Sequence, residues 1–202
     1  MKEKQTKTIS HTDIVYTAIF GSLWGLSEIF FGTALQTMRI PFRGAIMSVA
    51  AVMILTCSKE FVRYRSSIIV IGAVAATLKA FSMMNFSITP IVAIFLEALI
   101  VEAVFLIMGY HVVSSMIGGG FILLYTFTHG LIMHGIFFGS QIYRLYINIL
   151  KEIASWLNVH EGNLYLFLIA IALMYFVVGA VFGSIGWLIA QRANKIIQED
   201  LP

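Results

Sequence analysis

Long apolar stretches are the feature of this sequence that most restricts its fold. Six of them reach the roughly 17 to 25 residues that a helix needs to cross the hydrocarbon core of a membrane. They occupy residues 14–35, 42–58, 67–84, 88–109, 113–139 and 164–190. Because 59% of the 202 residues are hydrophobic and only 11% are charged, the chain has too little polar surface for a soluble domain of this size. We therefore expect an all-α membrane protein with six transmembrane helices, which forms a single membrane domain over residues 1–202.

Composition argues against several other classes. The stretches lack the period-two alternation of a membrane β-barrel, and 16 glycines suit closely packed transmembrane helices. A single cysteine, Cys57, excludes an internal disulfide and a thiolate metal site. The net charge of +3 is small and is spread over the loops, which indicates membrane topology and no nucleic-acid surface.

The distribution of basic residues predicts the orientation. Six spans place both termini on one side of the membrane. Eight basic residues then lie on that side, namely Lys2, Lys4, Lys7, Lys59, Arg63, Arg65, Arg192 and Lys195. Four lie on the other side, namely Arg39, Arg43, Arg144 and Lys151. By the positive-inside rule, both termini are cytoplasmic.

The connection between the fifth and sixth spans, residues 140–163, is the only long external one. Its stretch QIYRLYINILKEIASWL places apolar residues at steps of three and four, with polar residues opposite. This pattern predicts an amphipathic helix at the outer surface. Such a helix either lies in the headgroup layer or forms a lid over an outward-facing cavity.

Ionisable residues interrupt the apolar stretches at a similar depth. At about 1.5 Å per residue, Glu28, Lys79 and Glu97 lie about 8 to 13 Å below the outer surface. Side chains of this kind face protein or a water-filled cavity, because lipid offers them neither a partner nor solvent. Lys79 and Glu97 alone would also serve as an ion pair that fixes two helices. One lysine cannot neutralise two carboxylates, so we favour a polar binding cavity in the outer half of the membrane.

Other side chains complete this predicted substrate site. His129 and Tyr125 lie on the fifth span near the same depth, His134 lies nearer the rim, and Arg43 begins the second span. Trp24 and Phe31 on the first span would add apolar or stacking surface. A ligand with both positive and negative groups suits this set, and His129 or His134 would also suit a metal chelate or porphyrin.

The same residues allow an intramembrane enzyme as an alternative, acting on a lipid or prenyl substrate. His129 and His134 are five residues apart, however, whereas zinc-binding helices use a spacing of four. No nucleophile motif is apparent either. We therefore predict no catalytic residue, no resident metal and no cofactor. A third alternative is a structural subunit of a membrane complex, in which buried charges only attach helices to one another.

Glu102 differs from Glu97, although both lie in the stretch FLEALIVEAVF. Five residues separate them, which is about 7.5 Å along a helix and about 140° around it. They therefore do not form a side-by-side pair. We interpret Glu102 as a protonated packing residue or as a coupling element.

Small residues predict close helix contacts on three of the spans. The stretch SSMIGGGF in the fifth span favours a packing notch over a kink, and Gly179 and Gly183 form a similar face on the sixth span. The first span contains AIFGSLWG, with Ala18 and Ser22 four residues apart and Gly21 and Gly25 beside them. This face predicts contact with another membrane helix.

The six helices, the short chain, the polar outer half and the structured external loop resemble the substrate-binding (S) components of energy-coupling-factor transporters. In that family, an Ala-x-x-x-Ala pattern on the first helix contacts the transmembrane coupling subunit, and Ala18 and Ser22 occupy the matching positions. The resemblance implies capture of a vitamin or another micronutrient in a bacterial or archaeal cytoplasmic membrane. It also implies a transmembrane coupling (T) subunit and two ATPase subunits as partners. Consistent with separate ATPases, the chain has no Gly-x-x-x-x-Gly-Lys-Ser/Thr phosphate loop.

Overall fold

The protein is all-helical, as predicted. The computed structural model describes residues 9–40, 42–82, 88–139, 141, 143–144, 147–149, 151 and 164–200. Its long helices are α1 (His11–Thr37), α2 (Arg43–Phe61), α3 (Ser67–Ser82), α4 (Ile88–Met108), α5 (Val112–Phe138) and α7 (Leu164–Asp200). Each coincides closely with one of the six apolar stretches.

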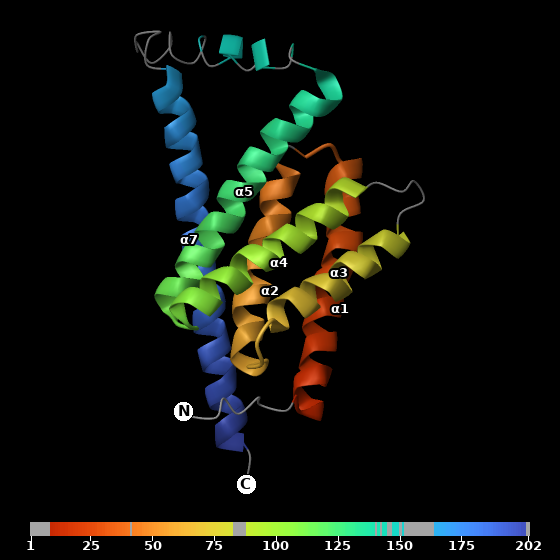
Figure 1. Cartoon of the computed structure of the whole chain (residues 1–202), viewed down its shortest axis with the longest axis vertical. Coiled ribbons are helices and arrows are strands. Elements are labelled where there is room, and N and C mark those ends of the chain that lie inside the picture. The colour runs from red at the N-terminus through yellow and green to blue at the C-terminus, as the bar shows by residue number, and fades with distance from the viewer. Residues whose placement is uncertain are drawn as a thin grey trace, which may run out of the picture.

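Five of these helices, α1, α2, α4, α5 and α7, are long and apolar enough to cross a membrane. The predicted sixth span, residues 67–84, is described only as far as Ser82: this part of α3 has 16 residues, which is about 24 Å. α3 is nevertheless apolar and lies within the bundle (Figure 1). The chain is thus a multi-pass helical membrane protein.

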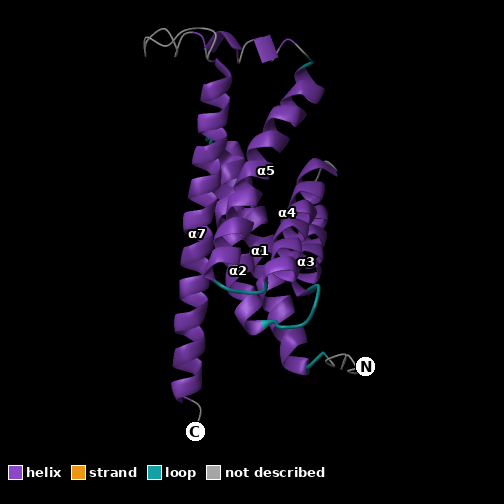
Figure 2. Cartoon of the chain, turned by 60° about the vertical axis from the view of Figure 1, so that its left-hand side comes forward, coloured by secondary structure: helices purple, strands orange, loops and turns teal. Residues whose placement is uncertain are grey.

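Figure 1 shows α1, α2 and α7 roughly upright, with α3, α4 and α5 inclined across them. α2 lies in the middle and contacts each of the other five helices. α1 begins and α7 ends at the same end of the bundle (Figures 1 and 2). We call this the terminal end; the turns at 62–66 and 109–111 also lie toward it.

Local signals explain where the helices begin. The backbone N–H of Ser10 donates to the Asp13 carboxylate at 3.0 Å, which caps α1. Gly109 adopts a φ of 77° where α4 ends, a conformation that glycine accepts without strain. His111 then caps α5, since its Nδ1 accepts from the Ser114 N–H at 3.1 Å.

Glycines set the contact between α5 and α7. A Cβ at Gly119 would clash with the Gly179 carbonyl, and one at Gly183 would clash with the Ser115 carbonyl. The backbones therefore approach each other as closely as the missing side chains allow. The small-residue faces predicted on the fifth and sixth spans are thus confirmed as packing within the chain.

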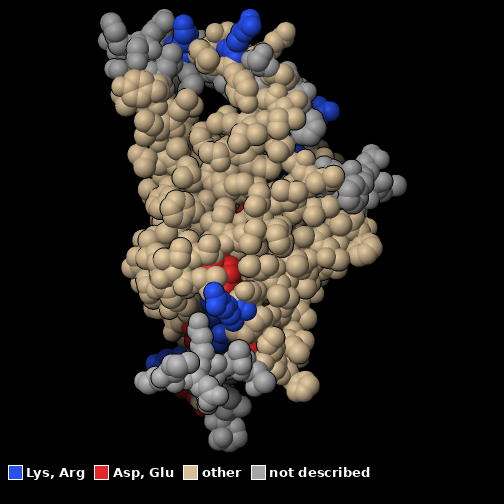
Figure 3. Space-filling model, viewed as in Figure 1, with Lys and Arg blue, Asp and Glu red and all other residues tan. Residues whose placement is uncertain are grey.

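Apolar side chains cover much of the outside. On α7, for example, Leu173, Met174, Val177 and Val181 are exposed. The wide middle band of the face in Figure 3 is almost free of charged side chains, which appear mainly toward the two ends. This distribution fits a bilayer around the bundle.

The predicted external amphipathic helix lies largely outside the described residues. Those of its residues that are described, Gln141, Tyr143, Arg144, 147–149 and Lys151, are helical and exposed. Its role as a lid stays a prediction.

Candidate functional site

The first polar cluster joins α1 to α3. The Lys79 ammonium donates to the Glu28 backbone carbonyl at 2.5 Å and lies 3.9 Å from the Glu28 carboxylate. Both side chains are about nine-tenths buried. A Cβ at Gly32, one turn further along α1, would lie 3.4 Å from the Lys79 nitrogen. Glycine at this position thus keeps one side of the ion pair uncovered.

The second cluster joins α4 to α2 and α5. Glu97 is 5% exposed. Its Oε1 lies 2.5 Å from the Ser48 hydroxyl and 3.4 Å from the Thr126 hydroxyl. The two hydroxyls are themselves 2.6 Å apart. Three helices therefore meet through three side-chain oxygens, which we call the oxygen triad.

The two clusters are close enough to interact electrostatically. Glu28 repels Glu97, and Arg43 repels Lys79, through Coulomb interactions. Tyr125 also interacts with Glu97. The predicted ionisable residues of α1, α2, α3 and α4 therefore lie in one zone of the bundle.

The predicted alternative pairing of Lys79 with Glu97 is wrong. The ion-pair partner of Lys79 is Glu28, on a helix that sequence spacing alone does not relate to α3. Glu97 is held by hydroxyl groups.

The remaining predicted residues lie at the margin of this zone or in the core. Tyr125 and His129 bond to each other, with 3.0 Å between the phenol oxygen and Nδ1. Arg43 and His134 are exposed. Trp24 is completely buried in the main core. Its packing at the α1–α3–α4 junction, 3.5 Å from a Cβ built at Gly72, argues for a core role over ligand stacking.

The predicted partner face on α1 divides in two. Gly21 and Gly25 are buried against α3, where a Cβ would meet Val74 and Leu78 at 2.7 and 2.8 Å. These two glycines are therefore used inside the chain, which corrects their assignment to a partner. Ala18 is exposed and Ser22 is half-buried, so this part of the predicted partner face is accessible from outside the bundle.

Sequence reasoning missed Ser48 and Thr126. Serine and threonine are common in membrane helices, where they usually bond to their own backbone, so neither carries a signal by itself. Their importance comes from tertiary contacts with a residue 49 and 29 positions away.

Glu102 belongs to a third cluster, at the terminal end. Its two carboxylate oxygens accept from the backbone N–H groups of Ser66 and Ile68, at 2.8 and 3.0 Å. The Lys59 ammonium lies 3.5 Å away and also donates to the Ser67 hydroxyl at 2.8 Å. Glu102 is thus a charged cap for the first turn of α3, which contradicts its interpretation as a protonated packing residue.

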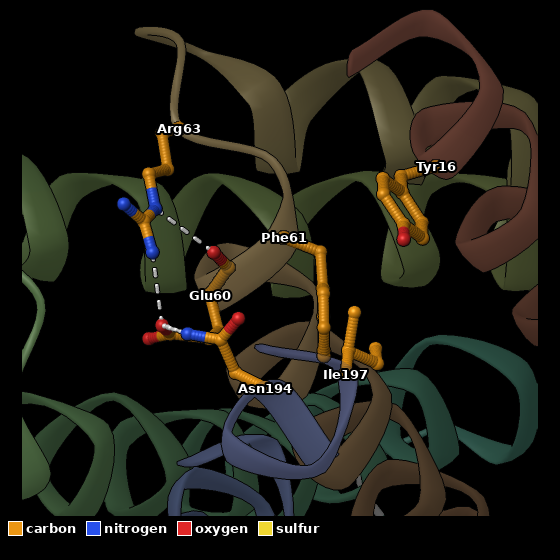
Figure 4. Close-up of a pocket in the computed structure, with 6 residues that line it drawn as sticks. All are labelled: Tyr16, Glu60, Phe61, Arg63, Asn194 and Ile197. Atoms are coloured by element: carbon orange, nitrogen blue, oxygen red, sulfur yellow. Dashed lines mark hydrogen bonds and ion pairs between the residues drawn. The ribbon is translucent and has the colours of Figure 1, made fainter. Parts of the chain in front are cut away.

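A fourth cluster, around Glu60, links α2 to α7. The Glu60 carboxylate accepts from Arg63 at 3.0 Å, from Gln191 at 2.6 Å and from Asn194 at 2.7 Å. Figure 4 shows Arg63 and Asn194 directed at this carboxylate. The small pocket beside them is lined by Tyr16, Glu60, Phe61, Arg63, Asn194 and Ile197. Every Glu60 oxygen is already bonded, so this cluster fastens the ends of two helices.

Tyr110, in the turn before α5, extends the fourth cluster. Its hydroxyl donates to the Thr56 carbonyl at 3.0 Å. Burial, and next the negative charge of Glu60, raise the pKa of Tyr110 above its ordinary value. The phenol therefore remains a hydrogen-bond donor at neutral pH.

A second pocket is apolar and open, lined by Ile100, Phe121, Leu124, Tyr125 and Thr128. Tyr125 is the one predicted site residue that lines either of these two pockets. Within the described residues, no group of three or more His, Cys, Asp or Glu side chains is arranged to hold a metal ion.

Comparisons with known proteins add no family. No family model matches the chain, and the searches of curated proteins and of solved structures find no match. The class defined by fold and composition is therefore a multi-pass helical membrane protein.

Proposed function

We propose that the chain is the substrate-capture subunit of an uptake transporter of the energy-coupling-factor type. In this role it binds a small organic micronutrient from outside, and separate partner subunits hydrolyse ATP. The proposal rests mainly on one observation: three ionisable side chains are buried in the interior of a membrane bundle, with Lys79 paired to Glu28 and Glu97 within Coulombic range of Glu28.

The charge of this zone supports binding of a ligand. The zone contains two buried carboxylates and one buried lysine, and that lysine is paired with Glu28. A negative ligand group would complement Lys79 or Arg43, and a positive group would complement the Glu28 carboxylate. A ligand of mixed charge therefore recovers part of the cost of burying these side chains.

The remaining features of the proposal concern orientation and partners. We assign the terminal end to the cytoplasm, because Arg63, Arg65, Arg192 and Lys195 belong to it. The exposed Ala18, with Ser22 beside it, offers the coupling subunit a face of small side chains on α1.

Native mass spectrometry of the protein purified from its own membrane tests the proposal. We expect a retained small molecule, a coupling subunit with two ATPases, or both. Lys79→Gln should lose the small molecule because the ligand loses its cationic contact. Lys195→Gln is the matched control, since the Lys195 side chain is 78% exposed and pairs with Glu199 one turn away on α7; it should retain the molecule.

Two results would count against the proposal. One is full retention of the small molecule by a folded Lys79→Gln variant. The other is the absence of any small molecule or partner, together with full stability of a Glu28→Lys, Lys79→Glu charge swap; the ion pair would then only attach α1 to α3. Turnover of a lipid or prenyl substrate by the purified chain without an ATPase would favour an enzyme.

A further inference from the structure

The oxygen triad of Glu97, Ser48 and Thr126 contains no positive charge. Among the described residues, no Lys, Arg or His lies within ion-pair distance of Glu97, and its hydrogen bonds come from hydroxyls alone. The other carboxylates of the bundle that are equally buried are compensated differently: Glu102 has Lys59 and two backbone N–H groups, and Glu60 has Arg63 and two amides.

The oxygen distances allow a directed chain of hydrogen bonds that begins at a protonated Glu97. The carboxylic acid would donate to Ser48 at 2.5 Å, Ser48 would donate to Thr126 at 2.6 Å, and Thr126 would donate to the Ile122 carbonyl at 3.0 Å. Each of the three protons then has one acceptor, and the chain ends at a carbonyl that needs no proton of its own.

An ionised Glu97 is satisfied less well. The chain would have to reverse, so that Thr126 donates to Ser48 and Ser48 donates to the carboxylate. The negative charge would then receive one short hydrogen bond, from Ser48, because the single hydroxyl proton of Thr126 is donated to Ser48 and the 3.4 Å contact of Thr126 with Glu97 has no proton of its own. A buried carboxylate without a cation is costly in a membrane interior.

The charged groups around Glu97 do not remove this cost. Glu28 on α1 adds a second negative charge, and Tyr125 on α5 is a neutral phenol. Lys79 on α3 is paired with Glu28, and Arg43 is at the exposed start of α2.

We propose that the oxygen triad is a proton-binding site, with the proton carried by Glu97 at neutral pH and released with reversal of the hydrogen-bond chain. In the release step, the Glu97 O–H bond breaks, the proton leaves to solvent, and the electron pair stays on the carboxylate. The ligand class of this site is a single positive charge. The site exists whether or not the chain captures a nutrient.

Infrared spectroscopy of the purified, ligand-free protein at pH 7 tests the proposal. We expect a C=O stretching band of a buried carboxylic acid that shifts in D₂O and is absent from Glu97→Gln. Glu199→Gln, which alters an exposed carboxylate on α7, is the matched control and should keep the band. Raising the pH should replace the band by carboxylate absorption in the native protein and in the control, and should cause no such change in Glu97→Gln.

Ser48→Ala provides a second test if Glu97→Gln does not fold. Its carboxylic acid loses its acceptor, so the band should move to higher wavenumber, whereas Thr128→Ala, which alters an exposed hydroxyl on α5, should leave it in place. A native protein without a band that depends on Glu97 would overturn the proposal. This outcome is separate from failure of nutrient capture, because no ligand or partner is present in the measurement.

Discussion

Glu97 and Glu102 are five residues apart on α4, yet their surroundings differ fundamentally. Glu102 is 1% exposed and accepts two backbone N–H groups beside a lysine. Glu97 is 5% exposed and contacts two hydroxyls. The first environment stabilises a negative charge, whereas the second leaves a negative charge without a cation.

The difference shows how burial of the same side chain can serve two purposes. Glu102 accepts from backbone N–H groups at the start of α3, and it ties the 62–66 turn to α4. Glu97 joins three helices through groups that exchange protons easily. The first arrangement is fixed by charge, and the second can change with the protonation of one residue.

The largest expected effect comes from Glu102→Gln. This change leaves the Lys59 ammonium buried without its counter-ion and weakens the cap of α3. Removal of one member of a buried ion pair costs about 3 to 5 kcal/mol. Reversible unfolding in mixed micelles should show a loss of this size.

The double variant Lys59→Met with Glu102→Gln is the control for that loss. It removes both charges, so it should recover a substantial part of the stability that Glu102→Gln alone loses. If the double variant is less stable than Glu102→Gln, the ion pair does not account for the role of Glu102.

Gly119→Ala should destabilise the protein through a steric clash, and its loss of stability can be compared with the loss caused by removing a charge. The new methyl group would clash with the Gly179 backbone, and a change of this kind costs about 1 to 3 kcal/mol. Gly130→Ala on the same helix is the control. A Cβ there meets nothing within 4 Å, so the same unfolding measurement should find it neutral or up to about 1 kcal/mol more stable. Equal losses in both variants would contradict the packing described for α5 and α7.

The elements of this fold could be predicted from the sequence because hydrophobic length is a local property. All six apolar stretches coincide with helices, and five have the length of a span. The predicted span at residues 67–84 ends outside the described residues, and its described part, α3, has 16 residues.

The candidate site was predictable only in part. An ionisable residue in an apolar stretch is visible in the sequence, so Glu28, Lys79 and Glu97 could be selected. Which residues pair depends on the contacts between helices. For this reason the Lys79–Glu28 pair, the hydroxyls of Ser48 and Thr126, and the capping role of Glu102 could not be derived from spacing. Assignment of the zone to substrate binding stays a prediction.

A smaller effect is expected for Ser48→Ala. The variant removes the middle of the hydrogen-bond chain, and the loss of one buried hydrogen bond costs about 1 kcal/mol. Unfolding in mixed micelles should therefore place it between Gly119→Ala and the native protein. Ser184→Ala is the control, because that exposed hydroxyl donates to the carbonyl of Val181 on its own helix. If Ser48→Ala lost as much stability as Glu102→Gln, the oxygen triad would contribute as much to the stability of the fold as the cap of α3.

The smallest effect is expected for Glu97→Gln, in spite of the burial of Glu97. The amide has the shape of a protonated carboxyl group, and its N–H can donate to Ser48 as the acid does. The chain of hydrogen bonds through Thr126 to Ile122 therefore remains complete, and stability at pH 7 should change by less than about 1 kcal/mol. Glu102→Gln, the same chemical change one and a half turns away, has no such substitute, because its carboxylate compensates the Lys59 charge. Parallel unfolding of the two variants measures the contrast directly. Similar losses of stability would show that both carboxylates are held as fixed charges. Glu97 and Glu102 would then not differ in the way their surroundings suggest.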